Sequence, residues 1–125
     1  DRTWSNPNLL VWHGRTWAID HGAALYFHHS WPRRGSNPAR FAGQGFDAGT
    51  HVLVDVADDP GPLHDDLAAV VGVGLIDQVL AEVPDEWLEL TDEMPDVEAV
   101  RTAYRLNLIA RRDNPSAWLP RKDPS

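Results

Sequence analysis

The chain has 125 residues, with no cysteine and a single lysine, Lys122. The lack of cysteine excludes disulfides, thiolate metal sites and cysteine nucleophiles, and it fits a reducing, cytoplasmic location. No apolar run of about 18 residues occurs, so we expect no transmembrane helix and no membrane partner. Hydrophobic residues make up 42% of the chain. This length and composition predict one globular domain with a single hydrophobic core.

Charge is unevenly distributed along the chain. Residues 1–46 carry five arginines and two aspartates, a net charge of +3, whereas residues 47–125 carry seventeen acids and six bases, a net charge of -11. An acidic protein lacks the basic face that binds nucleic acid, so we expect no nucleic-acid partner. The basic first segment either attracts phosphate groups or is an ordinary solvated surface.

The first secondary structure predicted is a β-hairpin. Residues 8–12 and 15–19 are rich in β-prone side chains, and the turn signal His13-Gly14 lies between them. Residues 31–49 are rich in Pro, Gly, Ser and Asn and are expected to form a long loop with at most one helical turn. We expect Trp12, Trp17 and Trp31 to pack the hairpin onto the helices. Trp4 is the exception, as a candidate for contact with a bound ligand.

Two helices are predicted after the loop. Apolar residues follow a spacing of three and four over residues 63–83, which predicts one helix that ends at Pro84, followed by Trp87 and Leu88 facing inward. Asp96 is the predicted N-cap of a last helix over residues 97–112. The order of hairpin, loop and helices predicts the α+β fold class, with one domain over residues 1–120 and a disordered tail over 121–125.

A pattern of chemical interest spans the hairpin. Asp1 and Asn6 form an Asp-x-x-x-x-Asn motif, and Asp20-His21-Gly22 follows the second strand. This is the order of the catalytic core of protein-kinase-like phosphotransferases. Asp1 would accept or orient the acceptor hydroxyl proton, and the oxygens of Asn6 and Asp20 suit magnesium. Gly22 would allow backbone angles that other residues avoid just after the metal ligand.

Each residue of the pattern also has an ordinary interpretation. Asp1 can be a solvated terminal residue, Asn6 a turn residue before a proline, and Asp20 a cap at the end of a strand. The Asp-x-Gly motif recurs at residues 47–49 and 59–61, neither of which follows a convincing strand. It is the combination with the strand-turn-strand unit that favours the kinase interpretation.

Residues 1–10 read Asp-Arg-Thr-Trp-Ser-Asn-Pro-Asn-Leu-Leu, and residues 17–25 read Trp-Ala-Ile-Asp-His-Gly-Ala-Ala-Leu. These two segments of the sequence resemble the HipA-like kinases of bacteria, in particular their small actinobacterial branch. They are also similar to phosphatidylinositol 4-kinases. The resemblance implies the mainly helical C-terminal lobe of a protein-kinase-like fold, with an N-terminal catalytic β-hairpin. It also implies Asp1 as the catalytic aspartate and Asn6 and Asp20 as ligands of magnesium and its bound ATP, with Asn8 as a second candidate.

The activity implied by the resemblance is transfer of the γ-phosphate of ATP to a hydroxyl acceptor, by default a protein serine or threonine. A kinase also needs a phosphate-contacting lysine on its N-terminal lobe, and Lys122 lies far past the catalytic core. We therefore expect this chain to be inactive unless the missing N-lobe is supplied. Two alternatives stay open: a non-catalytic kinase-like module that binds a protein, and a small-molecule phosphotransferase.

Overall fold

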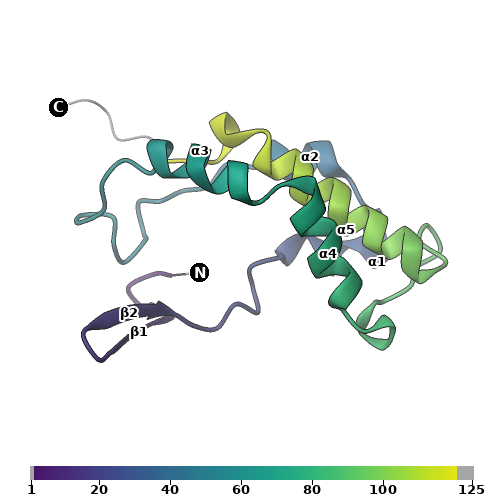
Figure 1. The fold of residues 1–125 in the computed structure, drawn as a ribbon, viewed down its shortest axis with the longest axis horizontal. Helices are drawn as coiled ribbons and strands as arrows, with labels where there is room; N and C mark the ends of the chain where they lie inside the picture. The colour runs from purple at the N-terminus through teal and green to yellow at the C-terminus, as the bar shows by residue number, and fades with distance from the viewer. Residues whose placement is uncertain (1, 121–125) are drawn as a thin grey trace.

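The computed structural model describes residues 2–120 and forms a small α+β domain (Figure 1). A two-stranded sheet lies at one end of the molecule, and helices α1, α2, α4 and α5 lie together at the other end. In chain order the elements are β1 (Leu9–Trp12), β2 (Arg15–Ala18), the 3₁₀ helix η1 (Tyr26–Ser30), α1 (Trp31–Arg34), α2 (Pro38–Ala42), α3 (Gly61–Val70), α4 (Val73–Glu82), η2 (Asp85–Trp87), α5 (Val97–Arg112) and η3 (Pro115–Ala117).

The predicted hairpin is confirmed. Strands β1 and β2 are antiparallel, with Leu9 opposite Ala18 and Trp12 opposite Arg15. The two residues of the turn, His13 and Gly14, have φ angles of 48° and 70°. Positive φ at both central residues is the conformation that matches the twist of paired strands, which explains why a glycine-containing pair joins them here.

The hairpin does not pack onto the helices through its tryptophans, so that prediction is wrong. Trp4, Trp12 and Trp17 are 67%, 60% and 48% exposed. Trp31 is the exception, since it is buried in the helical core. Both faces of the hairpin carry exposed apolar side chains, because side chains alternate between the two faces of a strand. The exposed apolar residues of this unit are Leu10, Val11, Trp12, Trp17 and Ile19.

The single helix predicted over residues 63–83 is wrong, because the structure divides it into α3 and α4. Val71 has ψ 61° and Gly72 has ψ 169°, so the chain leaves the helical conformation between the two helices. Arg112, on α5, donates a hydrogen bond of 3.0 Å to the carbonyl of Val71. The break is thus stabilised by a residue 41 positions away, whereas the apolar periodicity continues through it.

Residues 31–49 also contain more helix than predicted, since α1 and α2 both form there. The side chain of Asn37 accepts a hydrogen bond of 2.9 Å from the backbone amide of Arg40 and caps α2. Pro38 occupies the first helical position, where no amide donor is needed. Arg111 donates to the carbonyls of Phe41, at 3.0 Å, and Gln44 at the other end of α2.

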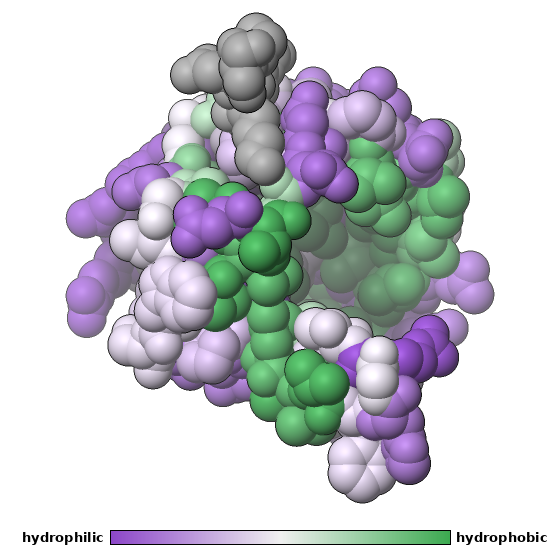
Figure 2. All heavy atoms as spheres, turned by 90° about the vertical axis from the view of Figure 1, so that its left-hand side faces the viewer, coloured by the Kyte–Doolittle hydropathy of each residue, from purple (hydrophilic) through white to green (hydrophobic). Residues whose placement is uncertain are grey.

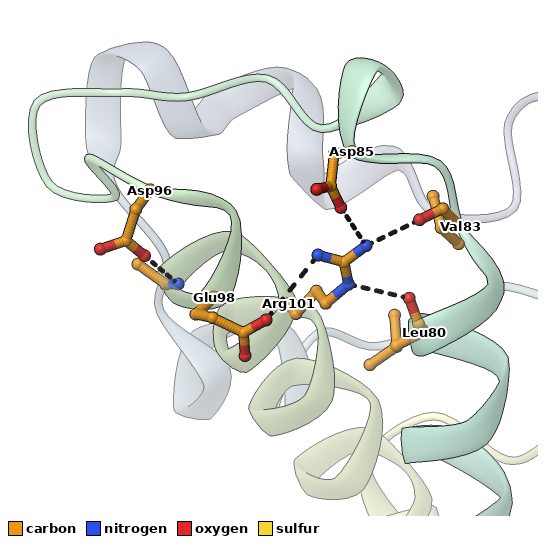
Figure 3. Close-up of polar contacts among 7 residues, drawn as sticks. Leu80, Val83, Asp85, Asp96, Glu98 and Arg101 are labelled. Carbon is orange, nitrogen blue, oxygen red and sulfur yellow. Dashed lines mark hydrogen bonds and ion pairs between the residues drawn. The ribbon is translucent and has the colours of Figure 1, made fainter.

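Helix α5 is confirmed with the predicted bounds, Val97–Arg112. The side chain of Asp96 accepts a hydrogen bond of 2.8 Å from the amide of Ala99, as expected of an N-cap. Figure 3 shows Arg101, one turn into the helix, reaching the carbonyls at the end of α4 and the carboxylate of Asp85. α5 is therefore the helix to which α2 and α4 are attached.

The hydrophobic core lies between α1, α5 and the segment that joins α4 to α5. It consists of the buried residues Trp31, Leu88, Met94, Val100 and Ala103, with Phe27 and Tyr104 packed against them. Leu88 faces inward as predicted, but Trp87 is 76% exposed, so its predicted burial is wrong. On the face seen in Figure 2, apolar side chains surround a hollow in the surface. Within residues 2–120, none of the helices has the length and apolarity needed to cross a bilayer.

Candidate functional site

The segment that contains Asn6 folds into a tight turn. The backbone amide and carbonyl of Thr3 exchange hydrogen bonds of 3.1 Å with those of Asn6. Trp4 therefore lies at the exposed tip of the turn. On its other side the segment is attached to the body of the protein, because Thr3 forms a β-bridge with His51 and the amide of Val52 donates to the carbonyl of Arg2 at 2.8 Å.

The hairpin register brings this turn to the segment that contains Asp20. The amide of Ile19 donates to the carbonyl of Asn8 at 2.9 Å, which extends the strand pairing by one step. Asn6 precedes Asn8 by two residues and Asp20 follows Ile19 directly. Both backbones therefore leave the hairpin at the same end, as the sequence pattern predicts.

Arg2 adds a second connection between the two segments. Its guanidinium group lies 3.5 Å from the carbonyl oxygen of Ile19 and 3.3 Å from the Nδ1 atom of His21. His21, which directly follows Asp20, is thus a hydrogen-bond partner of the turn segment. Sequence reasoning did not assign these roles to Arg2 and His21, because only the fold shows that they meet.

The backbone is in an unusual conformation on both sides of this connection. Asn8 has φ 46° and Asp20 has φ 52°, both in the left-handed region. Asn and Asp enter this region more readily than other non-glycine residues, but at a cost. Such conformations gather at functional sites. Gly22 does not adopt a positive φ, so the expectation that it provides the special backbone angle is wrong; Asp20 itself adopts it.

The three Asp-x-Gly motifs differ in what their carboxylates do. Asp47 accepts a hydrogen bond of 2.8 Å from the amide of Gly49, and Asp59 accepts one of 3.0 Å from Gly61. Both side chains are therefore used to close a local turn. Asp20 is exposed, and within residues 2–120 no hydrogen bond or ion pair engages its carboxylate. Of the three, Asp20 is the carboxylate available to an external ligand.

The donor groups at this end of the hairpin suit magnesium. Magnesium prefers oxygen ligands, keeps several waters, and is commonly held by one or two protein groups together with substrate phosphates. The carboxylate of Asp20 and the amide oxygen of Asn6 are ligands of this kind, and both residues are exposed. Residues 2–120 contain no cluster of three or more His, Cys, Asp or Glu side chains that could hold a metal, so a cation here would need ligands from a nucleotide or water.

The predicted site residues thus stand as follows. Asn6 and Asp20 lie at one end of the hairpin, and Asn8, the second candidate, is buried beside them. Asp1, the predicted catalytic aspartate, lies outside the described residues, as does Lys122. No family model, curated protein or solved structure matches the chain. The assignment of function therefore depends on the residues themselves.

Proposed function

We propose that this chain is the catalytic-lobe part of an ATP-dependent kinase that resembles the HipA-like family and acts in the cytoplasm on a hydroxyl acceptor, by default a protein serine or threonine. The observation that carries the proposal is the arrangement of residues at the open end of the hairpin. There Asp20, with a left-handed backbone and an exposed carboxylate, follows directly after the pair formed by Ile19 and Asn8. The Asn6 turn enters at the same end.

In the proposed mechanism Asp1 would accept or orient the proton of the acceptor hydroxyl, and Asn6 and Asp20 would be the residues that hold magnesium and its bound ATP. Magnesium, when bound, neutralises charge on the phosphoryl group being transferred. Arg2 fixes the two ligand segments to each other through Ile19 and His21. Such a kinase also requires a nucleotide-binding lobe with a phosphate-contacting lysine, which we propose is supplied by another part of the parent protein.

A cation-binding experiment on this chain tests the proposed metal ligands. Mn²⁺ is a paramagnetic substitute for magnesium. When it is titrated in the presence of ATP, it should broaden the amide NMR signals of residues 3–8 and 19–22 at lower concentrations than those of α5. Asp20→Asn should remove this effect, because it deletes the charge while Asn tolerates the same left-handed backbone. Asp47→Asn is the matched control, since its carboxylate closes a local turn. Broadening that survives in Asp20→Asn contradicts the assignment.

Activity is tested on the parent protein. Phosphotransfer from ATP should occur in the protein that contains the nucleotide-binding lobe and should be lost in Asp20→Asn but kept in Asp47→Asn. A screen with protein and small-molecule acceptors distinguishes a protein kinase from a small-molecule phosphotransferase. Absence of magnesium-dependent ATP binding to the parent protein would contradict both.

A second candidate function is a kinase-like module that binds a protein partner without catalysis. The exposed apolar side chains on both faces of the hairpin favour it, notably Val11, 71% exposed, and Trp12, 60% exposed. In that case the parent protein would bind a partner through the hairpin but would not bind MgATP. Calorimetric titration with MgATP therefore separates the two functions.

A further inference from the structure

A cavity of about 490 Å³ lies between η1, α1, α2 and α5. Aromatic side chains, arginines and a buried asparagine are among its lining residues, namely Tyr26, Phe27, Phe41, Arg34, Arg40 and Asn107. None of these residues belongs to the hairpin site. The combination of rings, cations and a buried amide in one cavity is the kind of lining that recognises a small organic molecule.

Asn107 provides the buried polar group. It is 1% exposed, and its Nδ2 atom donates hydrogen bonds of 2.6 Å to the Oγ of Ser36 and 2.8 Å to the carbonyl of Ala103. The carbonyl of Ala103 can only accept, so this contact fixes which end of the amide is the nitrogen. Among the residues that the structure describes, none donates a hydrogen bond to its Oδ1 atom. A buried acceptor without a donor is costly, and a ligand with an O–H or N–H group would satisfy it.

The sequence contained a signal for this residue. Val100 and Ala103, both buried, mark the inner face of α5, and position 107 continues the same helical spacing. An asparagine there places a polar group where the pattern requires an apolar one. Polar residues on a buried face need a partner, so Asn107 is the position of α5 at which a binding role could be expected.

The two arginines are exposed, whereas Asn107 is buried, so they lie toward the mouth of the cavity. Within residues 2–120 neither Arg34 nor Arg40 forms an ion pair. The carboxylate of Glu93 lies against Gly35, which lines the cavity, but within residues 2–120 it pairs with neither guanidinium. Two unpaired guanidinium groups at one opening favour a carboxylate or other planar anion.

Aromatic rings line the cavity between the exposed arginines and the buried Asn107. Phe27 and Phe41 lie with ring centroids 4.4 Å apart, and Tyr26 is 69% exposed beside them. Arg111 is positioned over Phe41, at 5.2 Å from the ring centroid, and its Nη1 atom donates to the carbonyls of Phe41 and Ala42 in α2. Arg111 thus holds Phe41 and α2 in place, whereas Arg34 and Arg40 are the arginines that line the cavity. Flat rings pack well against such a wall.

We propose that this cavity binds a small aromatic acid that carries a ring hydroxyl. The acid group pairs with Arg34 and Arg40, the ring packs against Phe27 and Phe41, and the hydroxyl donates to the Oδ1 atom of Asn107. This inference is independent of the proposed kinase activity, because it uses no residue of the hairpin.

Calorimetric or NMR titration of the full chain with 4-hydroxybenzoate and the longer 4-hydroxyphenylacetate tests the proposal. We expect saturable binding of at least one of them. Benzoate and phenylacetate, which lack the hydroxyl, should bind at least about fivefold more weakly, because the amide oxygen stays unsatisfied. This comparison tests Asn107 without a substitution in the core. Equal affinity with and without the hydroxyl would overturn the assigned role of Asn107.

The anion contact is tested by substitution. Arg34→Gln and Arg40→Gln should each weaken binding of the hydroxylated acid by about tenfold. Arg33→Gln is the matched control, since it removes a neighbouring exposed charge that does not line the cavity, and it should leave affinity unchanged. The proposal is overturned if no acid of the panel binds at millimolar concentration, or if all three variants have the same effect, which would indicate general charge attraction.

Discussion

The guanidinium group of Arg101 lies 2.7 Å from the carboxylate of Asp85 and also donates to two backbone carbonyls, those of Leu80 at 3.1 Å and Val83 at 2.7 Å (Figure 3). The side chain of Arg101 is 15% exposed, whereas that of Asp85 is 67% exposed. The contacts to the carbonyls are therefore better protected from water than the ion pair. Arg101 binds the C-terminal end of α4 to α5, where the last carbonyls of a helix lack partners.

Substitutions at the two residues should differ in their effect on stability. Arg101→Met keeps much of the side-chain volume but leaves the carbonyls unpaired, and we expect it to lower the free energy of unfolding by about 2 kcal/mol. Asp85→Asn removes only an exposed ion pair and should cost less than about 1 kcal/mol. Urea denaturation measures both. Equal losses would mean that the ion pair, and not the capping of α4, carries the stabilisation.

Gly35 should be intolerant of a side chain. It has φ 64° and ψ 177°, a conformation essentially restricted to glycine, and a Cβ atom there would collide with the carboxylate of Glu93. We expect Gly35→Ala to lower the free energy of unfolding by about 1–3 kcal/mol. Gly74→Ala, inside α4 with no atom within 4 Å of the new carbon, should raise it by up to about 1 kcal/mol.

The double variant Gly35→Ala with Glu93→Ala separates the two causes. It removes the collision but not the backbone strain, so we expect only part of the stability to return. Chemical denaturation of the single and double variants provides the comparison. Full recovery would show that the conformation at Gly35 carries no strain of its own.

The cap of α5 is the third test. Asp96→Ala removes the acceptor for the amide of Ala99 and should reduce the free energy of unfolding by about 1 kcal/mol. Asp96→Ser keeps a capping oxygen and should cost a few tenths of that amount. Thermal unfolding followed by circular dichroism measures both variants. A loss as large for Ser as for Ala would argue that the charge of Asp96, and not its hydrogen bond, matters.

His28 should make stability depend on pH. Burial lowers the pKa of His28 below its ordinary value of 6.5, and the neighbouring His29 lowers it further, while Glu89 acts in the opposite direction. As the pH falls below about 6.5, the unfolded chain takes up the proton before the folded protein does. The stability contributed by neutral His28 is complete above that pH and is lost as the pH falls toward the folded pKa.

Urea denaturation between pH 7.5 and 5 should therefore give a decline that His28→Gln reduces. His13→Asn is the matched control. It removes an exposed imidazole in the hairpin turn and replaces it with a residue that accepts positive φ. A decline that is unchanged in His28→Gln would contradict the assignment.

Local signals in the sequence predicted the elements whose cause is local. The His13-Gly14 turn and the Asp96 cap depend on residues within a few positions, and both the hairpin and α5 are confirmed. The break between α3 and α4 lies at Gly72, where glycine weakens a helix. Arg112 stabilises the break by donating to the carbonyl of Val71, a contact that no local pattern contains. The exposure of Trp12 and Trp17 was missed for the same reason, since apolar composition does not show what covers a strand.

In the candidate site, too, the features with a local cause were predictable and those that depend on tertiary contacts were not. The register between Asn8 and Ile19 was predictable from the length of the turn, so the common edge of Asn6 and Asp20 was predictable as well. The contact of Arg2 with His21 and the unpaired Oδ1 of Asn107 depend on tertiary packing. The kinase assignment stays a prediction.

The exposed hairpin has a consequence for the dynamics of the protein. A two-stranded unit with little buried surface is marginally stable by itself, and its attachments include the bridge from Thr3 to His51 and the contact of Val52 with Arg2. Its amide hydrogens should therefore exchange with solvent through a local opening that leaves α5 folded. Binding of a ligand at the hairpin would slow that exchange selectively, so the region proposed for chemistry is also the region whose order a ligand could most easily change.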